Sequence, residues 1–327
     1  MNRRARAGLH AAGLFTLAVV CFATVSCRSH SRPLVAVIPE TTAQELWESE
    51  HAGAERAAQT LGWSVYWNGP SREDDINRQI QIVNHAIKKG VAGIVLSPDH
   101  AVALITPIRS AMTAGIPVVI VGSPLSLATQ KNLSFVVNDD KAMGTLAAQR
   151  LGPQLRSRDA VAVLGVYPGI VSLVERAKAF EDALRQSHPD VRIIERRSSS
   201  FGFAEAEESA EETIRANPDL RSIVGMNIVQ TRAAYFALVA TGMLGRITLV
   251  GCDQDLDLVR QMRAGAIDAL VAEDTAAMGY DALQLLAAQR SGHESWTKKL
   301  VPPVLITREN VDRPDIQQLL DMNWRVH

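Results

Sequence analysis

Two carboxylates, Asp253 and Glu273, stand where they could take part in chemistry at one site. Each directly follows a short apolar run, 249–252 for Asp253 and 269–272 for Glu273. Two carboxylates that face a sugar can act as acid and base in glycoside hydrolysis, or they can accept hydrogen bonds from a ligand that stays intact. We favour binding, because both residues stand at the ends of predicted strands of an α/β fold. Ligands of such folds bind at the carboxyl ends of the strands, which already accounts for both carboxylates. Together their negative charge favours a cationic or amine-bearing ligand, unless Arg232 faces inward and pairs with Glu273.

Three more polar residues end predicted strands. They are Ser97, Ser123 and Asn227. A hydroxyl or an amide offers both a donor and an acceptor to a ligand, although serines in such places often only cap turns. Asp253 has a similar alternative role as the N-cap of the helix that follows it.

Known catalytic motifs are missing from the sequence. It contains no P-loop, G-x-G-x-x-G, H-E-x-x-H, paired C-x-x-C or G-x-S-x-G, and its eight histidines have no metal-ligand spacing. We therefore expect a protein that is not an enzyme and that uses no metal and no cofactor.

Apolar runs typical of buried strands alternate with segments of helical spacing, and the alternation restarts after about residue 139. The predicted strands are 34–38, 63–67, 93–97, 117–121 and 133–137, then 160–165, 191–196, 222–225, 247–251 and 269–272. The predicted helices are 44–61, 74–89 and 102–114, then 173–186, 204–216, 231–241, 256–264 and 278–290. Strands separated by helices form parallel sheets with right-handed crossovers. The fold class is therefore α/β, with two doubly wound parallel-sheet lobes.

Length and composition agree with two lobes. The chain has 327 residues, of which 47% are hydrophobic and 21% charged, as in a folded globular protein of about two domains. The net charge of −1 lacks the basic excess of nucleic-acid-binding proteins.

The first 26 residues form a separate segment. Arg3, Arg4 and Arg6 precede an apolar run from Leu9 to about Val25, and the segment contains no acidic residue. This pattern predicts a secretory signal peptide over residues 1–26. The alternative is a membrane anchor, for which the run is short, since spanning needs about 20 residues.

The end of that segment resembles a bacterial lipobox, in which the cysteine carries lipid. Thr24-Val25-Ser26-Cys27 departs from the pattern at Thr24, where leucine is usual. We expect lipid on Cys27 to anchor the mature chain to a membrane without spanning it, with residues 27–33 as a tether. A secreted chain without lipid is the alternative.

Several stretches, in their order and spacing, resemble the ribose/galactose-type periplasmic binding proteins. The resemblance runs from about Pro33 to Thr307. The matching stretches are 75–83, 90–98, 114–119, 137–140 with Gly144, 174–176 leading to Phe180, 250–253, and 273–279.

The resemblance implies a type I fold in which three crossover strands join the lobes. The lobes would comprise residues 34–138 plus 274–300 and residues 139–273 plus 301–327, with crossovers near Asn138, Glu273 and Val301. Asn138, Asp139 and Asp140 would form the hinge, where the two aspartates act as helix caps or hinge hydrogen-bonders.

The resemblance also implies a ligand site between the lobes. Trp47 occupies the place of an aromatic residue that stacks on the ligand, unless it only packs its helix on the sheet. Asn227 and Asp253 match ligand-binding residues of the family. The departures are Gly122-Ser123 for an Asp–Arg pair, Val174 for an arginine, Ile228 for an aspartate and Glu273 for a glutamine.

Together with the signal peptide and the lipobox-like segment, the resemblance implies an exported, lipid-anchored solute-binding protein, periplasmic or at the cell surface. It would capture a small polar ligand, with sugars as the leading class, and deliver it as a monomer to the permease of an ABC importer. The alternative is a receptor that presents its ligand to a membrane sensor kinase or chemoreceptor. The signal peptide argues against a transcription regulator of the same fold, which would need a DNA-binding headpiece there.

Overall fold

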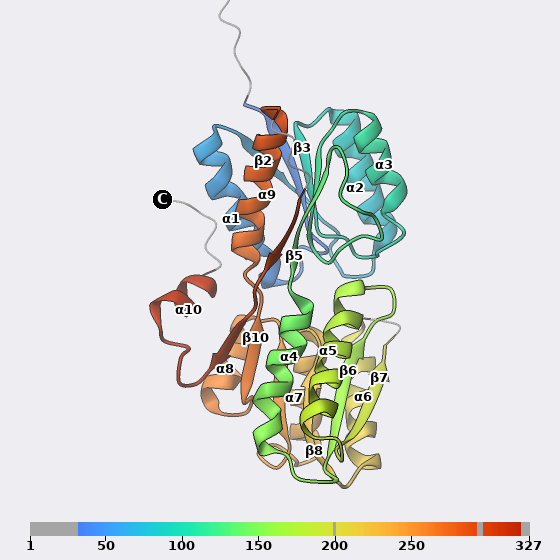
Figure 1. Ribbon diagram of the computed structural model, residues 1–327, viewed down its shortest axis with the longest axis vertical. Helices are drawn as coiled ribbons and strands as arrows, with labels where there is room; N and C mark the ends of the chain where they lie inside the picture. Colours follow the sequence, from blue (N-terminus) through green and yellow to red (C-terminus); the bar gives the residue numbers. More distant parts are fainter. Residues whose placement is uncertain (1–31, 199–200, 293–296, 322–327) are drawn as a thin grey trace, which may run out of the picture. The chain divides into compact units, whose positions relative to one another are not determined.

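The computed structural model describes residues 32–198, 201–292 and 297–321. Within these ranges, twelve strands form two six-stranded sheets, and helices cover both faces of each sheet (Figure 1). The predicted fold class, two doubly wound α/β lobes, is confirmed. The predicted signal peptide, residues 1–26, and the predicted lipid site, Cys27, lie outside the described residues. Of the helices in the described ranges, none has the length and apolar character needed to cross a membrane.

The first sheet is parallel throughout and has the order β11-β5-β4-β3-β1-β2. Its strands are β1 (Leu34–Ile38), β2 (Ser64–Trp67), β3 (Gly93–Leu96), β4 (Val118–Gly122), β5 (Leu133–Asn138) and β11 (Lys298–Val301). The second sheet has the order β12-β10-β9-β8-β6-β7, in which only β12 is antiparallel to its neighbour. Its strands are β6 (Ala160–Val166), β7 (Arg192–Arg197), β8 (Leu220–Gly225), β9 (Thr248–Cys252), β10 (Ala269–Ala272) and β12 (Val304–Thr307). The two sheets thus repeat one strand order, the 2-1-3-4-5 arrangement of flavodoxin-like sheets with a sixth strand added.

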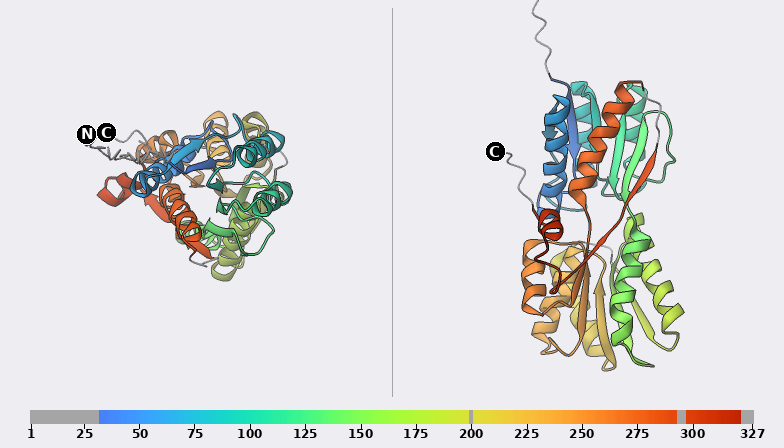
Figure 2. Two further views of the ribbon diagram at one scale, coloured as in Figure 1. Left: turned by 90° about the horizontal axis from the view of Figure 1, so that it is seen from above. Right: turned by 60° about the vertical axis from the view of Figure 1, so that its left-hand side comes forward.

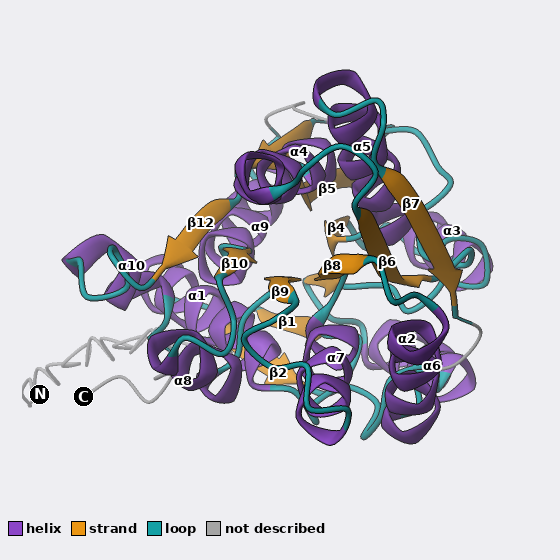
Figure 3. Ribbon diagram, turned by 90° about the horizontal axis from the view of Figure 1, so that it is seen from below, coloured by secondary structure: helices purple, strands orange, loops and turns teal. Residues whose placement is uncertain are grey.

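Helices enclose each sheet in two layers, as the end-on view in Figure 3 shows for the second sheet. The first sheet packs against α1 (Glu45–Leu61) and α9 (Thr275–Arg290) on one face, and against α2 (Ile76–Lys89) and α3 (Ile105–Thr113) on the other. The second sheet packs against α4 (Asp140–Leu151) and α5 (Val171–Ser187) on one face. On its other face lie α6 (Phe203–Ala216), α7 (Ile228–Ala240), α8 (Leu256–Ala264) and α10 (Pro314–Leu319).

The strands are apolar along their whole length because both of their faces are covered. In β1, Val35 and Val37 pack toward α1 and α9, whereas Ala36 and Ile38 pack toward α2 and α3. All four side chains are fully buried. The short apolar run that predicted this strand is therefore the pattern of a two-sided core.

Three passages of the described chain connect the sheets (Figure 2). The chain passes from β5 into α4 and from β10 into α9, and each of these helices packs on the sheet that the preceding strand does not belong to. The third passage leads from β11 to β12. The sequence did not predict α4, because its inner face is built from small residues, Gly144, Ala147 and Ala148, which give a weak apolar stripe. It also did not predict the short elements β11, β12 and α10.

Candidate functional site

A polar cavity lies between the two lobes, where the strands of both sheets end. From the first lobe it receives residues that end or follow β1, β2, β4 and β5, and from the second lobe residues that follow β6, β7, β8, β9 and β10. The lining residues are Glu40, Gln44, Leu46, Trp47, Glu73, Gly122, Ser123, Asn138, Ile170, Ser172, Leu173, Arg176, Phe201, Asn227, Ile228, Asp253 and Glu273. Parallel sheets place ligand sites at this edge because the loops that leave neighbouring strands diverge there.

Of the six residues predicted to contact a ligand, five line this cavity: Trp47, Ser123, Asn227, Asp253 and Glu273. Ser97 does not line it. Its hydroxyl donates a 2.8 Å hydrogen bond to Glu50 Oε2 in the interior of the first lobe. Burial raises the pKa of Glu50 to about 8, although the bond from Ser97 lowers it. In this structure Ser97 therefore serves as the partner of a buried carboxyl.

Asp253 and Glu273 share a buried arginine that the sequence analysis missed. Arg176 of α5 donates from Nη1 to Asp253 Oδ1 at 2.8 Å and from Nη2 to Glu273 Oε1 at 2.6 Å. It also donates from Nε and Nη2 to Asp140 Oδ1 at 3.1 and 2.9 Å, and from Nη1 to the carbonyl oxygen of Met226 at 2.7 Å. A guanidinium has five N–H donors, and all five are used here. The alternative in which Arg232 faces inward and pairs with Glu273 is not what the structure has, because Arg232 pairs with Asp255.

This ion cluster is buried, since Arg176 is only 1% exposed. Burial alone would lower the pKa of Arg176, but Asp253, Asp140 and Glu273 raise it well above its usual range. Burial raises the pKa of Asp140 to about 7 against the lowering influence of Arg176. Burial likewise raises the pKa of Asp253 well above its usual range. One cation thus faces three carboxylates, and its charge compensates only part of theirs.

Backbone geometry fixes the two cavity carboxylates in place. Asp253 adopts a left-handed conformation with φ 65°, which aspartate tolerates better than most residues. The backbone of Glu273 is held by the side-chain amide of Gln254, which donates to the Glu273 carbonyl oxygen at 2.8 Å and accepts from its N–H at 2.9 Å. The cap of the helix after Asp253 is Asp255, whose Oδ1 accepts from Leu258 N–H at 2.7 Å. Asp253 is therefore not the N-cap of that helix.

The three predicted hinge residues have separate roles at the passage from β5 to α4. Asn138 ends β5 and lines the cavity. Asp139 is the N-cap of α4, and its Oδ1 accepts from Ala142 N–H at 3.0 Å. Asp140 binds Arg176 and so connects this passage to the cavity carboxylates.

Trp47 and Asn227 approach the cavity from opposite lobes. Trp47 lies in the first turn of α1 and is 5% exposed, and its indole N–H has no acceptor among the described residues. Asn227 is the N-cap of α7, where its Oδ1 accepts from Gln230 N–H at 2.9 Å. The amide nitrogen of Asn227 is not used in this cap. One of its two N–H groups interacts with the Tyr167 hydroxyl, whose pKa this hydrogen bond lowers, and the other can donate to a ligand.

Two further carboxylates line the first-lobe side of the cavity, and the prediction did not include them. Glu40 follows β1, and Glu73 lies between β2 and α2, where it accepts a hydrogen bond from Gln44 Nε2. Burial raises the pKa of Glu73 to about 7 and that of Glu40 well above its usual range, with further increases from Asp99, Glu73, Glu273 and Asp253. Glu40 was detectable in the sequence by the same criterion as Asp253, a polar residue after an apolar run. Glu73 carried no such signal.

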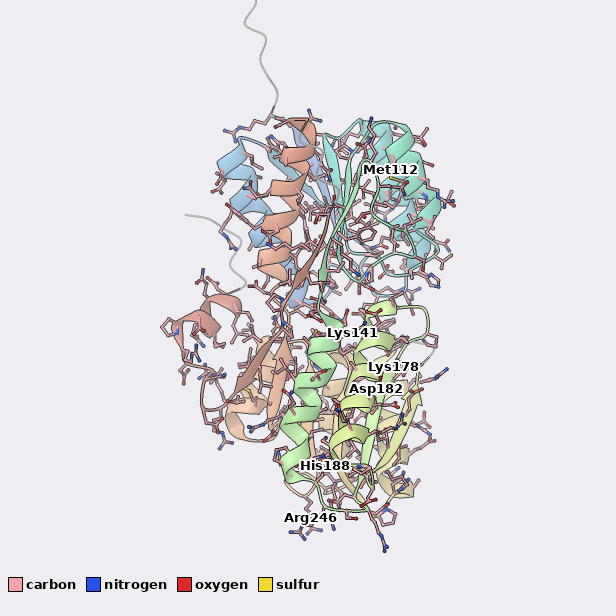
Figure 4. All side chains as sticks on the ribbon, viewed as in Figure 1. Met112, Lys141, Lys178, Asp182, His188 and Arg246 are labelled. Carbon is pink, nitrogen blue, oxygen red and sulfur yellow. The ribbon has the colours of Figure 1, made fainter. Side chains whose placement is uncertain are left out.

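Ordinary surface ion pairs lie elsewhere on the same helix. Lys178 and Asp182 pair at 2.6 Å on the outer side of α5, where 72% and 58% of their side chains are exposed (Figure 4).

In the described ranges, no group of three or more histidine, cysteine or acidic side chains could hold a metal ion. The cavity can thus accept hydrogen bonds from hydroxyl and amino groups, while its guanidinium is already fully engaged.

Comparison with known proteins gives a coherent set of relatives. The family model described as "Periplasmic binding protein domain" matches residues 35–294. A D-ribose/D-allose-binding protein of Pseudomonas aeruginosa is 25% identical over 293 residues, which cover 86% of this chain and 91% of that protein.

Solved structures agree. A carbohydrate transporter solute-binding protein of Agrobacterium radiobacter, in complex with D-arabinose, is similar with a TM-score of 0.82 at 25% identity, covering 90% of this chain and 100% of that one. An ABC transporter solute-binding protein of Agrobacterium vitis with bound D-fucose is similar with a TM-score of 0.82 at 27% identity, covering 88% and 100%. By their names, the first of these relatives is a sugar-binding protein and the two solved structures are solute-binding proteins of transporters.

Proposed function

The chain belongs to the periplasmic binding protein family, and from this premise we propose that it captures a small polyhydroxylated ligand, a sugar or a sugar derivative, between its two lobes. It would deliver this ligand to the permease of an ABC importer. The observation that carries the proposal is the cavity at the strand ends, in which carboxylate and amide groups from both lobes surround a tryptophan.

The donors and acceptors of the cavity suit hydroxyl groups. Arg176 holds one oxygen each of Asp253 and Glu273, and the other oxygen of each is not held by this arginine. Ser123 and Asn227 add a hydroxyl and an amide. Carboxylates accept two or more hydrogen bonds, so this set binds several hydroxyls in fixed positions, and the face of Trp47 packs on the apolar C–H surface of a ring.

Few direct hydrogen bonds connect the two lobes around the cavity, which suits opening and closing. Ala101 N–H donates to the Gly169 carbonyl oxygen at 3.2 Å, and Ser172 N–H donates to Ser123 Oγ at 3.5 Å. Leu256 N–H donates to Glu45 Oε2 at 3.3 Å. A ligand that contacts both walls binds the closed form more tightly than the open form and so drives closure. Closure would change the surface that the permease meets.

Binding of unmodified sugars tests the proposal. Isothermal titration calorimetry with D-ribose, D-allose, D-arabinose and D-fucose should give saturable binding for at least one of them. Asp253→Asn should weaken that binding about 10-fold or more, because a hydrogen bond to a charged group is worth about 1.5–3 kcal/mol. Asparagine tolerates the left-handed backbone at this position. Absence of binding by every sugar and sugar derivative tested would contradict the proposal.

We also propose that the mature chain is exported, carries lipid on Cys27 and acts as a monomer. The names of its family and of relatives such as the D-allose-binding periplasmic protein of Escherichia coli support an exported protein. Mass spectrometry of the protein from a bacterial membrane fraction should find a mature N-terminus at Cys27 with added acyl mass. Light scattering of the soluble part should give the mass of one chain.

A further inference from the structure

We propose that the ligand is a polyol that carries a protonated amine, an amino sugar or amino polyol, and that Glu40 and Glu73 bind this amine. The inference rests on the proposed function, since it specifies the ligand of the same cavity. The sequence alone placed the positive group of such a ligand at Asp253 and Glu273. The proposal places it at Glu40 and Glu73, on the first-lobe side of the cavity.

The charges that line the cavity are unbalanced. Among its described lining residues, Arg176 is the only cationic side chain, and four carboxylates line the cavity with it: Glu40, Glu73, Asp253 and Glu273. All five donors of Arg176 are used by the second-lobe carboxylates and a carbonyl oxygen. Arg176 therefore has no donor left for Glu40 or Glu73.

Glu40 has no neutralising partner. It forms no hydrogen bond or ion pair with another described residue, and the charged groups that influence it, Asp99, Glu73, Glu273 and Asp253, are all acidic. Glu73 has only the amide of Gln44. A partly buried carboxylate without a cation or several donors is costly, and a ligand ammonium group would supply three donors and the missing charge.

An independent observation on the same cavity comes from Trp47. Its indole N–H is buried, lacks an acceptor among the described residues, and belongs to a side chain that is 95% buried in the cavity wall. A buried donor of this kind indicates a ligand acceptor, such as a hydroxyl oxygen. The face of an indole also attracts a cation. A ligand with hydroxyls and an ammonium group satisfies both properties of this residue.

A metal ion does not fit the same charge. Within the described residues, no group of three or more acidic, histidine or cysteine side chains is arranged to hold one. Glu40 and Glu73 instead stand on separate loops of the wall, which suits a larger organic cation. With a neutral sugar in the cavity, Glu40 and Glu73 would either be protonated or keep a negative charge that no positive group compensates.

The test compares each amino sugar with its uncharged relatives. The probes are D-glucosamine, D-galactosamine and D-mannosamine, each beside its parent hexose and its N-acetyl derivative, measured by calorimetry near pH 7. At least one amine should bind 10-fold or more tightly than both relatives, because a charge-assisted hydrogen bond changes affinity by about 10- to 100-fold. Because the pKa of Glu73 is about 7, amine binding should also release protons, seen as a binding enthalpy that depends on the buffer.

Matched variants assign the effect to the wall. Glu40→Gln and Glu73→Gln should each remove most of the preference for the amine over its parent hexose and over its N-acetyl derivative. Glu55→Gln, on α1 but outside the cavity lining, should change neither. Equal binding of amine and parent sugars would overturn this inference and leave the proposed function standing. Failure of all these compounds and of the four unmodified sugars would overturn both.

Discussion

Replacement of Arg176 by methionine should destabilise the ligand-free protein strongly. The methionine fills most of the volume but removes five hydrogen bonds and the one cation, among the described residues, that pairs with Asp140, Asp253 and Glu273. Removal of one partner from a buried ion pair costs about 3–5 kcal/mol. With about 2–4 °C of melting temperature per kcal/mol for a chain of this size, we expect a decrease of roughly 6–20 °C at pH 7.5.

The matched control is Lys178→Met on the same helix. Lys178 contacts Asp182 at 2.6 Å, as closely as Arg176 contacts Glu273, but this pair is exposed to solvent (Figure 4). Exposed pairs of this kind contribute at most about 1 kcal/mol, so the melting temperature should decrease by only a few degrees. Scanning calorimetry or circular dichroism of the two variants and the wild type measures the difference.

A pH series identifies the cause. Burial raises the pKa of Asp140 and of Asp253, so without Arg176 these two carboxylates avoid burial as anions only by binding protons. The deficit of Arg176→Met should therefore be smaller at pH 5 than at pH 8. Addition of Asp140→Asn to Arg176→Met should restore part of the stability, because one of the uncompensated charges is removed. If Arg176→Met and Lys178→Met cost the same at every pH, the reasoning about the buried cluster is refuted.

Three further predictions concern the first lobe. Burial raises the pKa of Glu50 and of Asp99 to about 8 each, so the native state binds more protons than the unfolded state between about pH 4 and 8. The ligand-free protein should therefore lose stability as the pH rises through this range, which melting curves at pH 5, 6.5 and 8 would detect. Gly279→Ala places a Cβ 2.2 Å from the Glu50 carbonyl oxygen and should cost about 1–3 kcal/mol, measured by urea unfolding; unchanged stability would contradict the close contact of α9 with α1. Trp47→Ala should weaken sugar binding at least 10-fold in calorimetry, whereas equal affinity would show that this ring only packs its helix.

Much of the architecture followed from local patterns. Apolar runs with β-branched residues predicted strands. Capping residues such as Asp75 and Gly90 mark the two ends of α2, close to where the spacing placed them. Because polar residues at strand ends share one edge of a parallel sheet, the sequence also predicted that Asp253, Glu273 and Asn227 belong to one site. A helix with a small-residue face, α4, could not be predicted in this way.

The direction in which a side chain points at a strand end was visible only in the tertiary structure. Ser97 directly follows β3, close to where the prediction placed it, but its hydroxyl points to Glu50 inside the lobe, because successive residues of an extended segment point to opposite faces. Moving a polar residue by one position at a strand end changes whether its side chain points into the cavity or into the core. The length of an apolar run does not locate a strand end to within one residue.

The sequence by itself determined the fold class, the strand ends and half of the polar residues around the cavity, because these depend on neighbours along the chain. Only the tertiary structure decided how charge is distributed there. Arg176 reaches Asp140, Asp253 and Glu273 across 36, 77 and 97 residues of sequence, and no local pattern encodes such contacts. The same closure of distant segments brings no cation from the described part of the chain into an ion pair with Glu40 or Glu73. Electrostatic interactions depend on the distance between charges in space and on their burial. The charge of the ligand could therefore be inferred only from the tertiary structure.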